Sequence, residues 1–311
     1  MSNILVIKHG SLGDLIQANG AIKDIKKFYK NRKVLLLTTE PYSIFMSECP
    51  YLDGVIIDKR LPRWNLFYLN NLKNKLERYN FSKVFDLQNS NRTQFYKRFI
   101  INKGVEWSST ETALELGQKK SDFEKDPVLD RIQKQLIKSG VETEFTKNID
   151  LSWAVEDISR LIKQYANADY ILLFPFCSIK HRDKKWPYFK DLVLRLKQDY
   201  KNKYPILIVP GPNEIDQANQ LSAKVVLDNN KAVSIKTLIS IINNAKFVVT
   251  NDTGPAHIAS HLDKKGIALF GSHTSAKKVS IENFNFKALS SKNLKDLSVE
   301  TVLDEVKSKL N

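Results

Sequence analysis

Short apolar runs recur through the first part of the chain, each followed by polar or turn-forming residues. Residues 4–7, 34–38, 54–57 and 84–85 form such runs, which are typical of strands in a sheet covered on both faces. The segment after the first run has apolar residues at a helical spacing, at Leu15, Ala18, Ile22, Ile25 and Phe28. Strands that alternate with helices predict right-handed crossovers in a parallel sheet.

A second series of the same kind follows a polar, irregular stretch at residues 102–148, in which the segment near 127–138 has a helical pattern. The expected strands of this series lie at residues 170–174, 206–209, 246–250 and 266–270. The expected helices between them lie at residues 186–197, 214–223 and 255–261. Apolar positions from 293 to 310 then repeat at roughly helical spacing and predict a closing helix.

The two series predict an α/β protein of GT-B type, with two Rossmann-like αβα domains at residues 1–155 and 156–292 and a closing helix at 293–311. A length of 311 residues favours two hydrophobic cores over one. Ligands of doubly wound parallel sheets bind outside the carboxyl ends of the strands. We therefore expect the two sheets to face a central cleft, with the functional residues on the loops that follow the strands.

A formal net charge of +15 suggests an anionic partner, such as nucleic acid, a membrane surface or a small anionic substrate. The cations form local clusters at residues 23–33, 59–63 and 180–185, without a zinc-finger, RNP or basic-zipper pattern. A solvated basic surface is the structural alternative for each cluster. Charge alone does not choose among these readings.

The first residues have only a short apolar run and no small-residue cleavage site, so no signal peptide is expected. No apolar stretch approaches the roughly 18 residues of a membrane span. Cys49 and Cys177 lie far apart, in no ligand-like spacing, and are expected to be reduced thiols. These features favour a cytoplasmic protein.

The turn after the first expected strand reads His9-Gly10-Ser11-Leu12-Gly13-Asp14. Glycines in such a turn let a ligand approach the backbone amides at a helix start. The turn lacks the pattern of a dinucleotide site and the lysine of a P-loop. Asp14 has two readings, as a carboxylate favoured by the helix dipole or as a general base at the cleft.

The strongest local signal is the segment Asn251-Asp252-Thr253-Gly254-Pro255 at the end of an expected strand. Its residues are helix-cap and turn formers, and the amides of a helix start can bind an anion. His257 and His261 follow at a spacing of four, but no glutamate base or third ligand accompanies them. We therefore expect no metal site there, and a well-capped helix is the alternative to an anion site.

Two further loops follow expected strands. A basic run at residues 180–185 suits a diphosphate leaving group, whose charge rises as a glycosidic bond breaks, or is simply a solvated loop. Glu214 in Gly211-Pro212-Asn213-Glu214 could bond a ribose or base, or serve as a charge at a helix start. Residues 271–274 could wrap a nucleotide.

Taken together, these motifs resemble the ADP-heptose:lipopolysaccharide heptosyltransferase family. The resemblance is carried in order by Ser-Leu-Gly-Asp, Lys-x-Trp-Pro, Gly-Pro-x-Glu, Asn-Asp-Thr-Gly-Pro-x-His-x-Ala and Leu-Phe-Gly-Ser, from residue 4 to about residue 272. It implies a GT-B architecture in which the second domain binds a nucleotide sugar and the first binds the acceptor. It also implies that the substrate is a nucleotide-sugar donor, an ADP-sugar, and that no separate cofactor is used.

By this resemblance, the motif aspartate Asp14 is the expected catalytic base. Donor binding is expected at Lys184, Glu214, Asp252, Thr253, Gly254 and His257, with Lys184 on the diphosphate and Glu214 on the nucleoside.

The segment at residues 58–64 resembles the family's basic acceptor loop, and the segment 86–92 resembles its polar loop. Arg60, Arg63 and Arg92 are therefore expected to bind an anionic inner-core sugar by forked hydrogen bonds. Such an acceptor lies at the inner leaflet of the cytoplasmic membrane, where the basic, aromatic stretch 60–79 could touch anionic headgroups.

These features lead to the hypothesis of an inverting glycosyltransferase. No Asp-x-Asp occurs in the chain, so a lysine and a helix start would replace the metal that many other glycosyltransferases use. Three alternatives remain: a nucleotide-sugar epimerase of similar architecture, a non-catalytic nucleotide-binding protein, and a nucleic-acid-binding protein. Turnover of donor without acceptor, or steeply salt-dependent binding of nucleic acid, would distinguish them.

Overall fold

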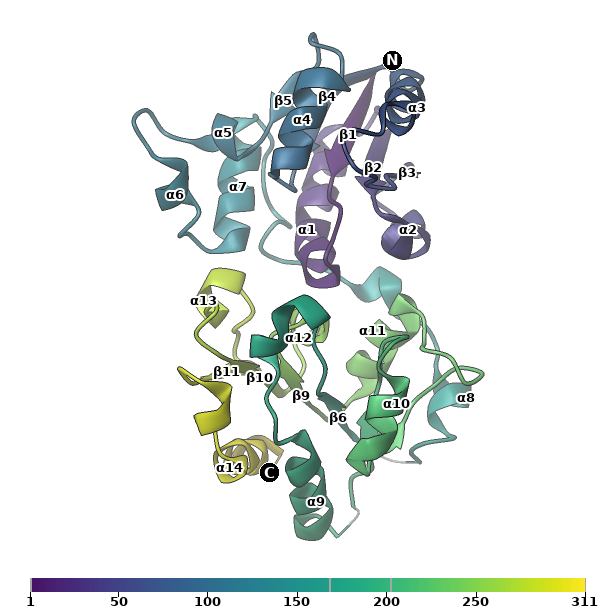
Figure 1. The fold of residues 1–311 in the computed structure, drawn as a ribbon, viewed down its shortest axis with the longest axis vertical. Helices are drawn as coiled ribbons and strands as arrows, with labels where there is room; N and C mark the ends of the chain where they lie inside the picture. Colours follow the sequence, from purple (N-terminus) through teal and green to yellow (C-terminus); the bar gives the residue numbers. More distant parts are fainter. Residues whose placement is uncertain (1, 168, 202, 311) are drawn as a thin grey trace. The chain divides into compact units, whose positions relative to one another are not determined.

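The computed structural model describes residues 2–167, 169–201 and 203–310. The chain divides into two compact units, Met1–Trp153 and Ala154–Asn311. Each unit is a parallel sheet with helices on both faces, which confirms the predicted fold class (Figure 1).

The sheet of the first unit has the strand order β3-β2-β1-β4-β5, and every pair is parallel. Its strands are β1 (Asn3–Ile7), β2 (Val34–Thr38), β3 (Gly54–Ile57), β4 (Phe81–Asp86) and β5 (Glu106–Ser108). Its helices are α1 (Leu12–Phe28), α2 (Glu40–Ser47), α3 (Leu66–Glu77), α4 (Asn91–Phe99), α5 (Thr110–Ala113), α6 (Lys120–Phe123) and α7 (Val128–Lys138). The helical pattern near 127–138 is thus confirmed as α7, whereas β5 was not predicted because it has only three residues.

The core of the first unit lies where β1 meets α3 and α4. Leu5 and Ile7 of β1 pack with Leu69 and Leu72 of α3 and with Tyr96 of α4. Since successive strand residues face opposite sides, Ile4 and Val6 point to the other face of the sheet, and both are fully buried. This double burial explains why β1 has no polar residue between Ile4 and Ile7.

The last segment of the first unit is fixed to α1 by Asp24. Its buried carboxylate accepts hydrogen bonds from the amides of Glu144, Phe145 and Thr146 and from the Thr146 hydroxyl, at 2.7–3.1 Å. Gly20 lies beneath this segment, and a Cβ there would stand 2.0 Å from the Phe145 carbonyl oxygen. The polar stretch after α7 is therefore ordered by contacts that no periodic pattern reveals.

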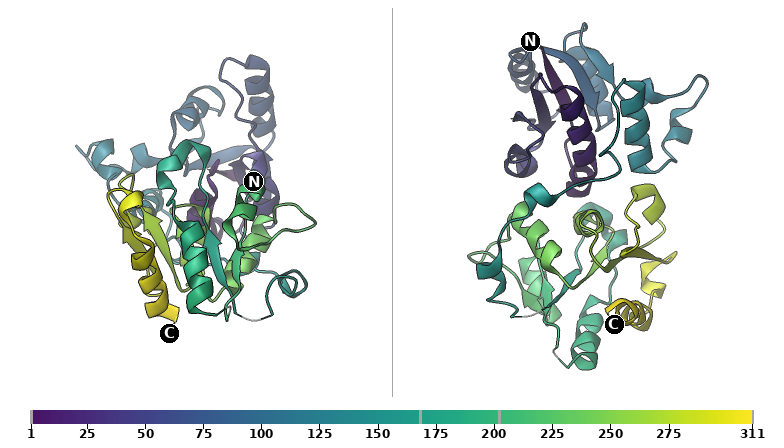
Figure 2. Two further views of the ribbon diagram at one scale, coloured as in Figure 1. Left: turned by 60° about the horizontal axis from the view of Figure 1, so that its bottom comes forward. Right: turned by 180° about the vertical axis from the view of Figure 1, so that it is seen from behind.

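The sheet of the second unit has the order β11-β10-β9-β6-β7-β8, again with parallel pairs throughout. Its strands are β6 (Ile171–Phe174), β7 (Ile206–Ile208), β8 (Lys224–Val225), β9 (Phe247–Asn251), β10 (Gly266–Phe270) and β11 (Phe286–Ser290). Its α-helices are α8 (Ser159–Ile162), α9 (Phe189–Asp199), α10 (Ile215–Ala218), α11 (Ile235–Asn244), α12 (Gly254–His261), α13 (Ala276–Val279) and α14 (Val299–Leu310). Both views in Figure 2 show α14 beside α9, and their apolar residues share one core with β6 and β10.

Three predicted helices of this unit differ from the structure. The segment 214–223 forms only α10 and a 3₁₀ turn at Asn219–Leu221. The helix expected from residue 186 begins at Phe189, because Trp186 is held by contacts outside the helix. The closing helix begins at Val299 rather than residue 293, because Leu297 is extended and the Ser298 hydroxyl accepts the Thr301 amide at the start of α14.

Candidate active site

In the first unit, Asp14 lies in the first turn of α1, directly after β1. Its Oδ2 accepts hydrogen bonds from the Ser11 amide at 2.7 Å and the Ser11 hydroxyl at 3.0 Å. Its Oδ1 lies 3.5 Å from Lys8 Nζ, and 41% of the side chain is exposed. Asp14 therefore caps the helix and presents a carboxylate to solvent at the same time, so its two sequence readings are compatible.

The turn that carries Asp14 depends on Gly10. This residue has a φ of +116°, and a Cβ placed on it would lie 2.3 Å from the Tyr42 ring. Burial and the charge of Asp14 raise the pKa of Tyr42. Tyr42 thus remains a neutral phenol that closes one side of the turn.

A buried carboxylate, Asp58, directly follows β3, which β2 separates from β1 in the sheet. Its Oδ2 lies 2.8 Å from His9 Nε2 and accepts a hydrogen bond of 2.8 Å from the Tyr96 hydroxyl. Its Oδ1 accepts from the Tyr68 hydroxyl and, at 2.8 Å, from the Arg60 amide. Burial alone would raise the pKa of Asp58, but His9, Tyr68 and the Arg60 amide together lower it to about 2.

The three predicted acceptor arginines are placed differently from one another. Arg92 donates to Tyr96 Oη at 2.9 Å and to the carbonyl oxygens of Arg60 and Leu61 at 3.2 and 2.9 Å. Arg60 and Arg63 are exposed, and the guanidinium of Arg63 lies 5.7 Å from the centre of the Phe95 ring. Arg92 therefore fixes the loop backbone, and Arg60 and Arg63 are the two that extend into solvent.

Sequence reasoning gave no role to Asp58, His9 or Tyr96. The available signal was a carboxylate directly after the expected strand at residues 54–57. The side chains that make Asp58 a junction, those of His9, Tyr68 and Tyr96, lie 10 to 49 residues away along the chain, so spacing does not predict them.

In the second unit, Asp252 follows β9 and is almost fully buried. Its Oδ2 lies 2.6 Å from Lys184 Nζ and 2.9 Å from His273 Nε2. Burial would raise the pKa of this carboxyl, but the hydrogen bond and charge of Lys184, with His273, lower it overall. Asp252 is thus a fixed negative charge that orients a lysine and a histidine at the carboxyl edge of the sheet.

The start of α12 lies next to this pair. Thr253 is its N-cap, but the Thr253 side chain makes no capping hydrogen bond, and Thr253, Gly254 and Pro255 are all partly exposed. Pro255 occupies one of the first two helical positions, where its missing N–H does no harm. His257, one turn further on, is buried.

Glu214 belongs to the loop after β7, where its Oε2 accepts the Gly211 amide at 2.7 Å. Burial raises its pKa, while the Gly211 amide and the charge of Lys185 act in the opposite direction. A Cβ at Gly211 would stand 3.2 Å from Glu214 Oε2, so the carboxylate lies close against the turn. Glu214 therefore shapes its own loop.

The basic run at residues 180–185 forms a 3₁₀ segment, Ile179–Lys184. The side chain of Lys180 lies outside the described part of the structure. The run is joined to β9 by Lys184 and also by Trp186, whose amide donates to Asn251 Oδ1 at 3.0 Å. The structure thus brings the Lys-x-Trp-Pro motif together with the Asn-Asp-Thr-Gly motif.

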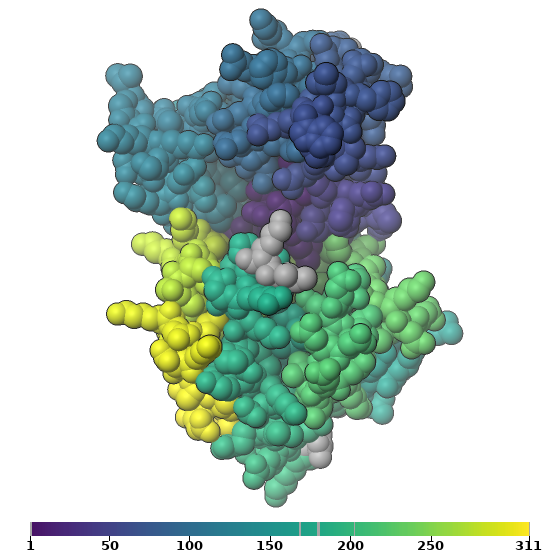
Figure 3. All heavy atoms as spheres, in the orientation of Figure 1, coloured from purple at the N-terminus to yellow at the C-terminus, as the bar shows by residue number. Residues whose placement is uncertain are grey.

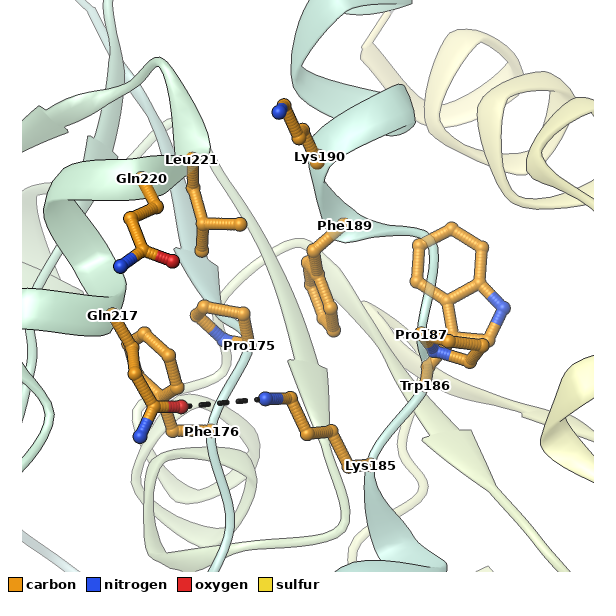
Figure 4. Close-up of a pocket in the computed structure, with 10 residues that line it drawn as sticks. All are labelled: Pro175, Phe176, Lys185, Trp186, Pro187, Phe189, Lys190, Gln217, Gln220 and Leu221. Atoms are coloured by element: carbon orange, nitrogen blue, oxygen red, sulfur yellow. Dashed lines mark hydrogen bonds between the residues drawn. The ribbon is translucent and has the colours of Figure 1, made fainter.

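A pocket of about 210 Å³ lies beside this loop (Figure 4). Phe176 and Phe189 form its apolar wall, and a 3.5 Å hydrogen bond between Lys185 Nζ and Gln217 Oε1 crosses it. None of the six predicted donor residues lines it. The pocket was not predicted from the sequence.

Within residues 2–167, 169–201 and 203–310, no three His, Cys, Asp or Glu side chains gather where they could hold a metal ion. Over the same residues, none of the helices has the length and apolar character to cross a bilayer.

Comparisons with known proteins were made by sequence and by fold. Residues 69–305 match the sequence model of glycosyltransferase family 9 (heptosyltransferase). No curated protein sequence matches the chain.

Among solved structures, the glycosyltransferase of family 9 from Veillonella parvula has a TM-score of 0.78 and 15% identity over 99% of this chain and 97% of its own. E. coli heptosyltransferase WaaC with ADP has a TM-score of 0.72 and 18% identity over 99% of each chain. UDP-GlcNAc 2-epimerase from Methanocaldococcus jannaschii has a TM-score of 0.63 and 12% identity over 100% of this chain and 93% of its own. At these identities the likeness establishes the fold.

Proposed function

We propose, on the premise that this chain belongs to glycosyltransferase family 9, that it is an inverting enzyme that transfers heptose from ADP-heptose to an anionic acceptor of the lipopolysaccharide-core type. Membership of this family makes it a glycosyltransferase that takes its sugar from a nucleotide donor. The family match distinguishes it from the epimerases, whose likeness is one of fold. What we propose beyond the family's chemistry is the identity of the sugar, of the nucleotide and of the acceptor.

The observation that carries the proposal is the arrangement of Lys184 and Asp252 beside the start of α12. An ammonium group has three N–H donors, so its bond to Asp252 orients Lys184 and leaves donors for phosphate oxygens. The amides at Thr253 and Gly254 and the dipole of α12 add positive potential at the same place. A nucleoside diphosphate would thereby be bound and its developing charge stabilised without a metal or another cofactor.

The remaining donor assignments follow from this position. Glu214, on the next loop, would accept hydrogen bonds from the ribose hydroxyls, and His257 would border the diphosphate one turn into α12. The role of Glu214 requires the donor to extend from β9 toward β7, which are separated in the sheet by β6 alone.

At the acceptor, Asp14 would take the proton of the attacking hydroxyl. As the new bond to the anomeric carbon forms, the bond from that carbon to the diphosphate oxygen breaks, and ADP leaves with the electron pair. Two Ser11 hydrogen bonds hold Asp14 in place, and its exposed part provides access to the acceptor. Arg60 and Arg63 would bind the acceptor's anionic groups, and Arg92 would keep their loop in position.

Two substitutions of Asp14 distinguish its role as a catalytic base from its role in capping α1. Asp14→Asn keeps an oxygen that can accept the Ser11 amide, so we expect unchanged donor binding, a stability change below about 1 kcal/mol and a loss of turnover of at least about 100-fold. Asp14→Ala should lose turnover and also about 1 kcal/mol of stability. Transfer by Asp14→Asn at the wild-type rate would reject the base assignment.

A donor panel identifies the nucleotide sugar. Because a ligand that binds the native state raises its thermal stability, ADP-heptose should raise the melting temperature more than UDP-sugars do. Conversion of the donor without any acceptor would instead indicate an epimerase.

A further inference from the structure

Four large apolar side chains are exposed between β3 and the first turn of α3. The exposed fractions are 38% for Leu61, 79% for Trp64, 75% for Leu66 and 78% for Phe67. In Figure 3 this stretch, in blue, lies on the visible outer surface of the first unit. Apolar side chains gathered in this way on a surface mark a site of interaction more often than scattered ones do.

The fold itself does not require these residues to be apolar. The buried face of α3 consists of Tyr68, Leu69, Leu72 and Leu76, which pack into the core of the first unit. Leu66 and Phe67 precede that face and point away from it. After them, the exposed positions Asn70, Asn71 and Asn74 are uncharged, and the exposed charged residues of the helix, Lys75 and Glu77, lie in its last turn.

The outer face of α4 extends this surface. The Phe95 and Phe99 rings lie 4.8 Å apart, and 55% of Phe99 is exposed. The Arg63 guanidinium lies over Phe95 at 5.7 Å, and that of Arg98 lies over Phe99 at 5.2 Å. These contacts join the loop before α3 to α4 in one surface, the docking patch, which consists of Leu61, Trp64, Leu66, Phe67 and Phe99 with Lys59, Arg60, Arg63 and Arg98.

The charge around the docking patch is almost entirely positive. Residues 59–78 contain six lysines and arginines and one acidic residue, Glu77. Residues 91–103 contain four lysines and arginines and no acidic residue. A basic rim around exposed aromatic and aliphatic side chains matches the boundary between anionic headgroups and acyl chains. Two copies of the chain would bring like charges together in a symmetric contact, which opposes self-association through this surface.

The loop of the docking patch is also held in a fixed conformation. Arg92 donates hydrogen bonds to the carbonyl oxygens of Arg60 and Leu61, and the Asp58 carboxylate accepts a hydrogen bond from the Arg60 amide. The apolar side chains that follow are thus presented from a fixed backbone, so less conformational entropy is lost when they insert.

We propose that the docking patch binds the surface of a lipid bilayer that contains anionic phospholipids, with Trp64, Leu66 and Phe67 inserted at the headgroup boundary. The patch includes the arginines assigned to the acceptor, so the same face would meet the membrane and the headgroup of an acceptor anchored in it. The inference deepens the proposed function, since it rests on an acceptor that is carried by a lipid.

The experiment is vesicle flotation with the full chain. The anionic vesicles contain phosphatidylcholine and roughly 30% phosphatidylglycerol. Wild type should bind them at least about tenfold more tightly than vesicles of phosphatidylcholine alone, and this binding should weaken as the salt concentration rises. The double variant Leu66→Ser with Phe67→Ser should lose at least about tenfold of this binding. The matched control is Ile44→Ser with Phe284→Ser, which removes side chains that are 78% and 91% exposed elsewhere on the chain and should bind like wild type.

A second measurement follows Trp64 itself. The chain has four tryptophans, of which Trp107 and Trp186 are buried and Trp64 is 79% exposed. Anionic vesicles should shift the emission to shorter wavelength in wild type and not in Trp64→Phe. Equal binding by the double variant and wild type, or a wild type that ignores anionic vesicles, would overturn the proposal. So would a lipid-free dimer that the double variant abolishes, because it would identify a second copy as the occupant.

Vesicle binding and sugar transfer are separate readouts. The double variant should still transfer sugar to a water-soluble acceptor fragment at the wild-type rate. A chain that binds vesicles but transfers no sugar would refute the proposed function and leave the docking surface standing, and the reverse result would refute the docking surface alone.

Discussion

Lys184 Nζ lies 2.6 Å from Oδ2 of Asp252, a carboxylate of which only 2% of the side chain is exposed. The pair joins two motifs that are 68 residues apart in the sequence. Lys184 and His273 lower the pKa of this buried carboxyl, and the ionised carboxylate holds the Lys184 side chain in one orientation. In the proposed enzyme this preorganisation favours the charge that appears on the departing diphosphate.

Replacing Lys184 by methionine should weaken ADP binding by at least about tenfold, since a charge-assisted hydrogen bond contributes about 1.5–3 kcal/mol. Isothermal titration of ADP measures the change. Lys185→Met is the matched control, because Lys185 is the exposed neighbour that turns to Gln217 rather than to Asp252. Equal effects of the two substitutions would mean that general positive charge, and not the oriented lysine, binds the nucleotide.

The Asp58 junction should make the first unit sensitive to acid. Its pKa is about 2 in the folded chain against an ordinary value of 3.8, so its contribution is present above pH 4 and is lost as pH falls toward 2. The shift corresponds to stability on the order of 2 kcal/mol. As pH falls from about 5 to about 2, a range that includes the folded and the unfolded pKa of Asp58, Asp58→Asn should therefore lose less stability than wild type does.

Urea unfolding at each pH, monitored by circular dichroism, gives this comparison. Glu142→Gln, at an exposed carboxylate of the same unit, should keep the wild-type pH dependence. A wild-type profile in Asp58→Asn would show that His9 and the two tyrosines do not stabilise the ionised carboxylate.

Gly10 should tolerate no side chain. Gly10→Ala places a Cβ 2.3 Å from the Tyr42 ring at a φ of +116°, whereas Gly140→Ala has a φ of +78° and nothing within 4 Å. Both variants bear the cost of a left-handed alanine, about 1 kcal/mol, but only the first has the clash. We expect Gly10→Ala to lose at least about 1 kcal/mol more than Gly140→Ala, and to lose transfer activity because the turn carries Asp14.

Thermal and urea unfolding of the two variants decide this point. Equal losses would mean that Tyr42 moves aside and that backbone conformation alone requires glycine at position 10.

The sequence was most informative where a residue's role depends on its near neighbours. Residues 4–7 were recognised as a buried strand because every position is apolar, and Asp14 because it follows that strand by one turn. The short β5 and β8 were missed, since strands of three and two residues contain too little pattern, and the five-residue β11 was missed as well. Their place in the sheet is set by neighbouring strands rather than by their own residues.

The site shows the same limit. The fold class and the grouping of motifs at strand ends could be predicted, because parallel strands present their carboxyl ends together. The internal use of Arg92 and Glu214 could not, since the carbonyl oxygens that Arg92 bonds lie 31 and 32 residues away and Glu214 folds back on Gly211. A charged residue on a loop looks the same in sequence whether it meets a ligand or its own backbone.

Trp186 tests whether the Lys-x-Trp-Pro motif also has a structural role. Its indole is fully buried and donates to the Leu297 carbonyl oxygen at 2.8 Å, which joins the segment before α14 to the loop that carries Lys184. Trp186→Phe keeps an aromatic ring but leaves that buried carbonyl without its donor, which costs about 1–3 kcal/mol of stability.

The matched control is Tyr188→Phe. It removes an exposed hydrogen bond of 3.0 Å to the carbonyl oxygen of Lys295 in the same segment, and should cost less than about 1 kcal/mol. Urea unfolding should therefore rank Trp186→Phe well below Tyr188→Phe in stability. ADP affinity should fall only in Trp186→Phe, because the displaced loop carries Lys184; an unchanged affinity in that variant would show that the bonds to Asp252 and Asn251 position the lysine without the indole.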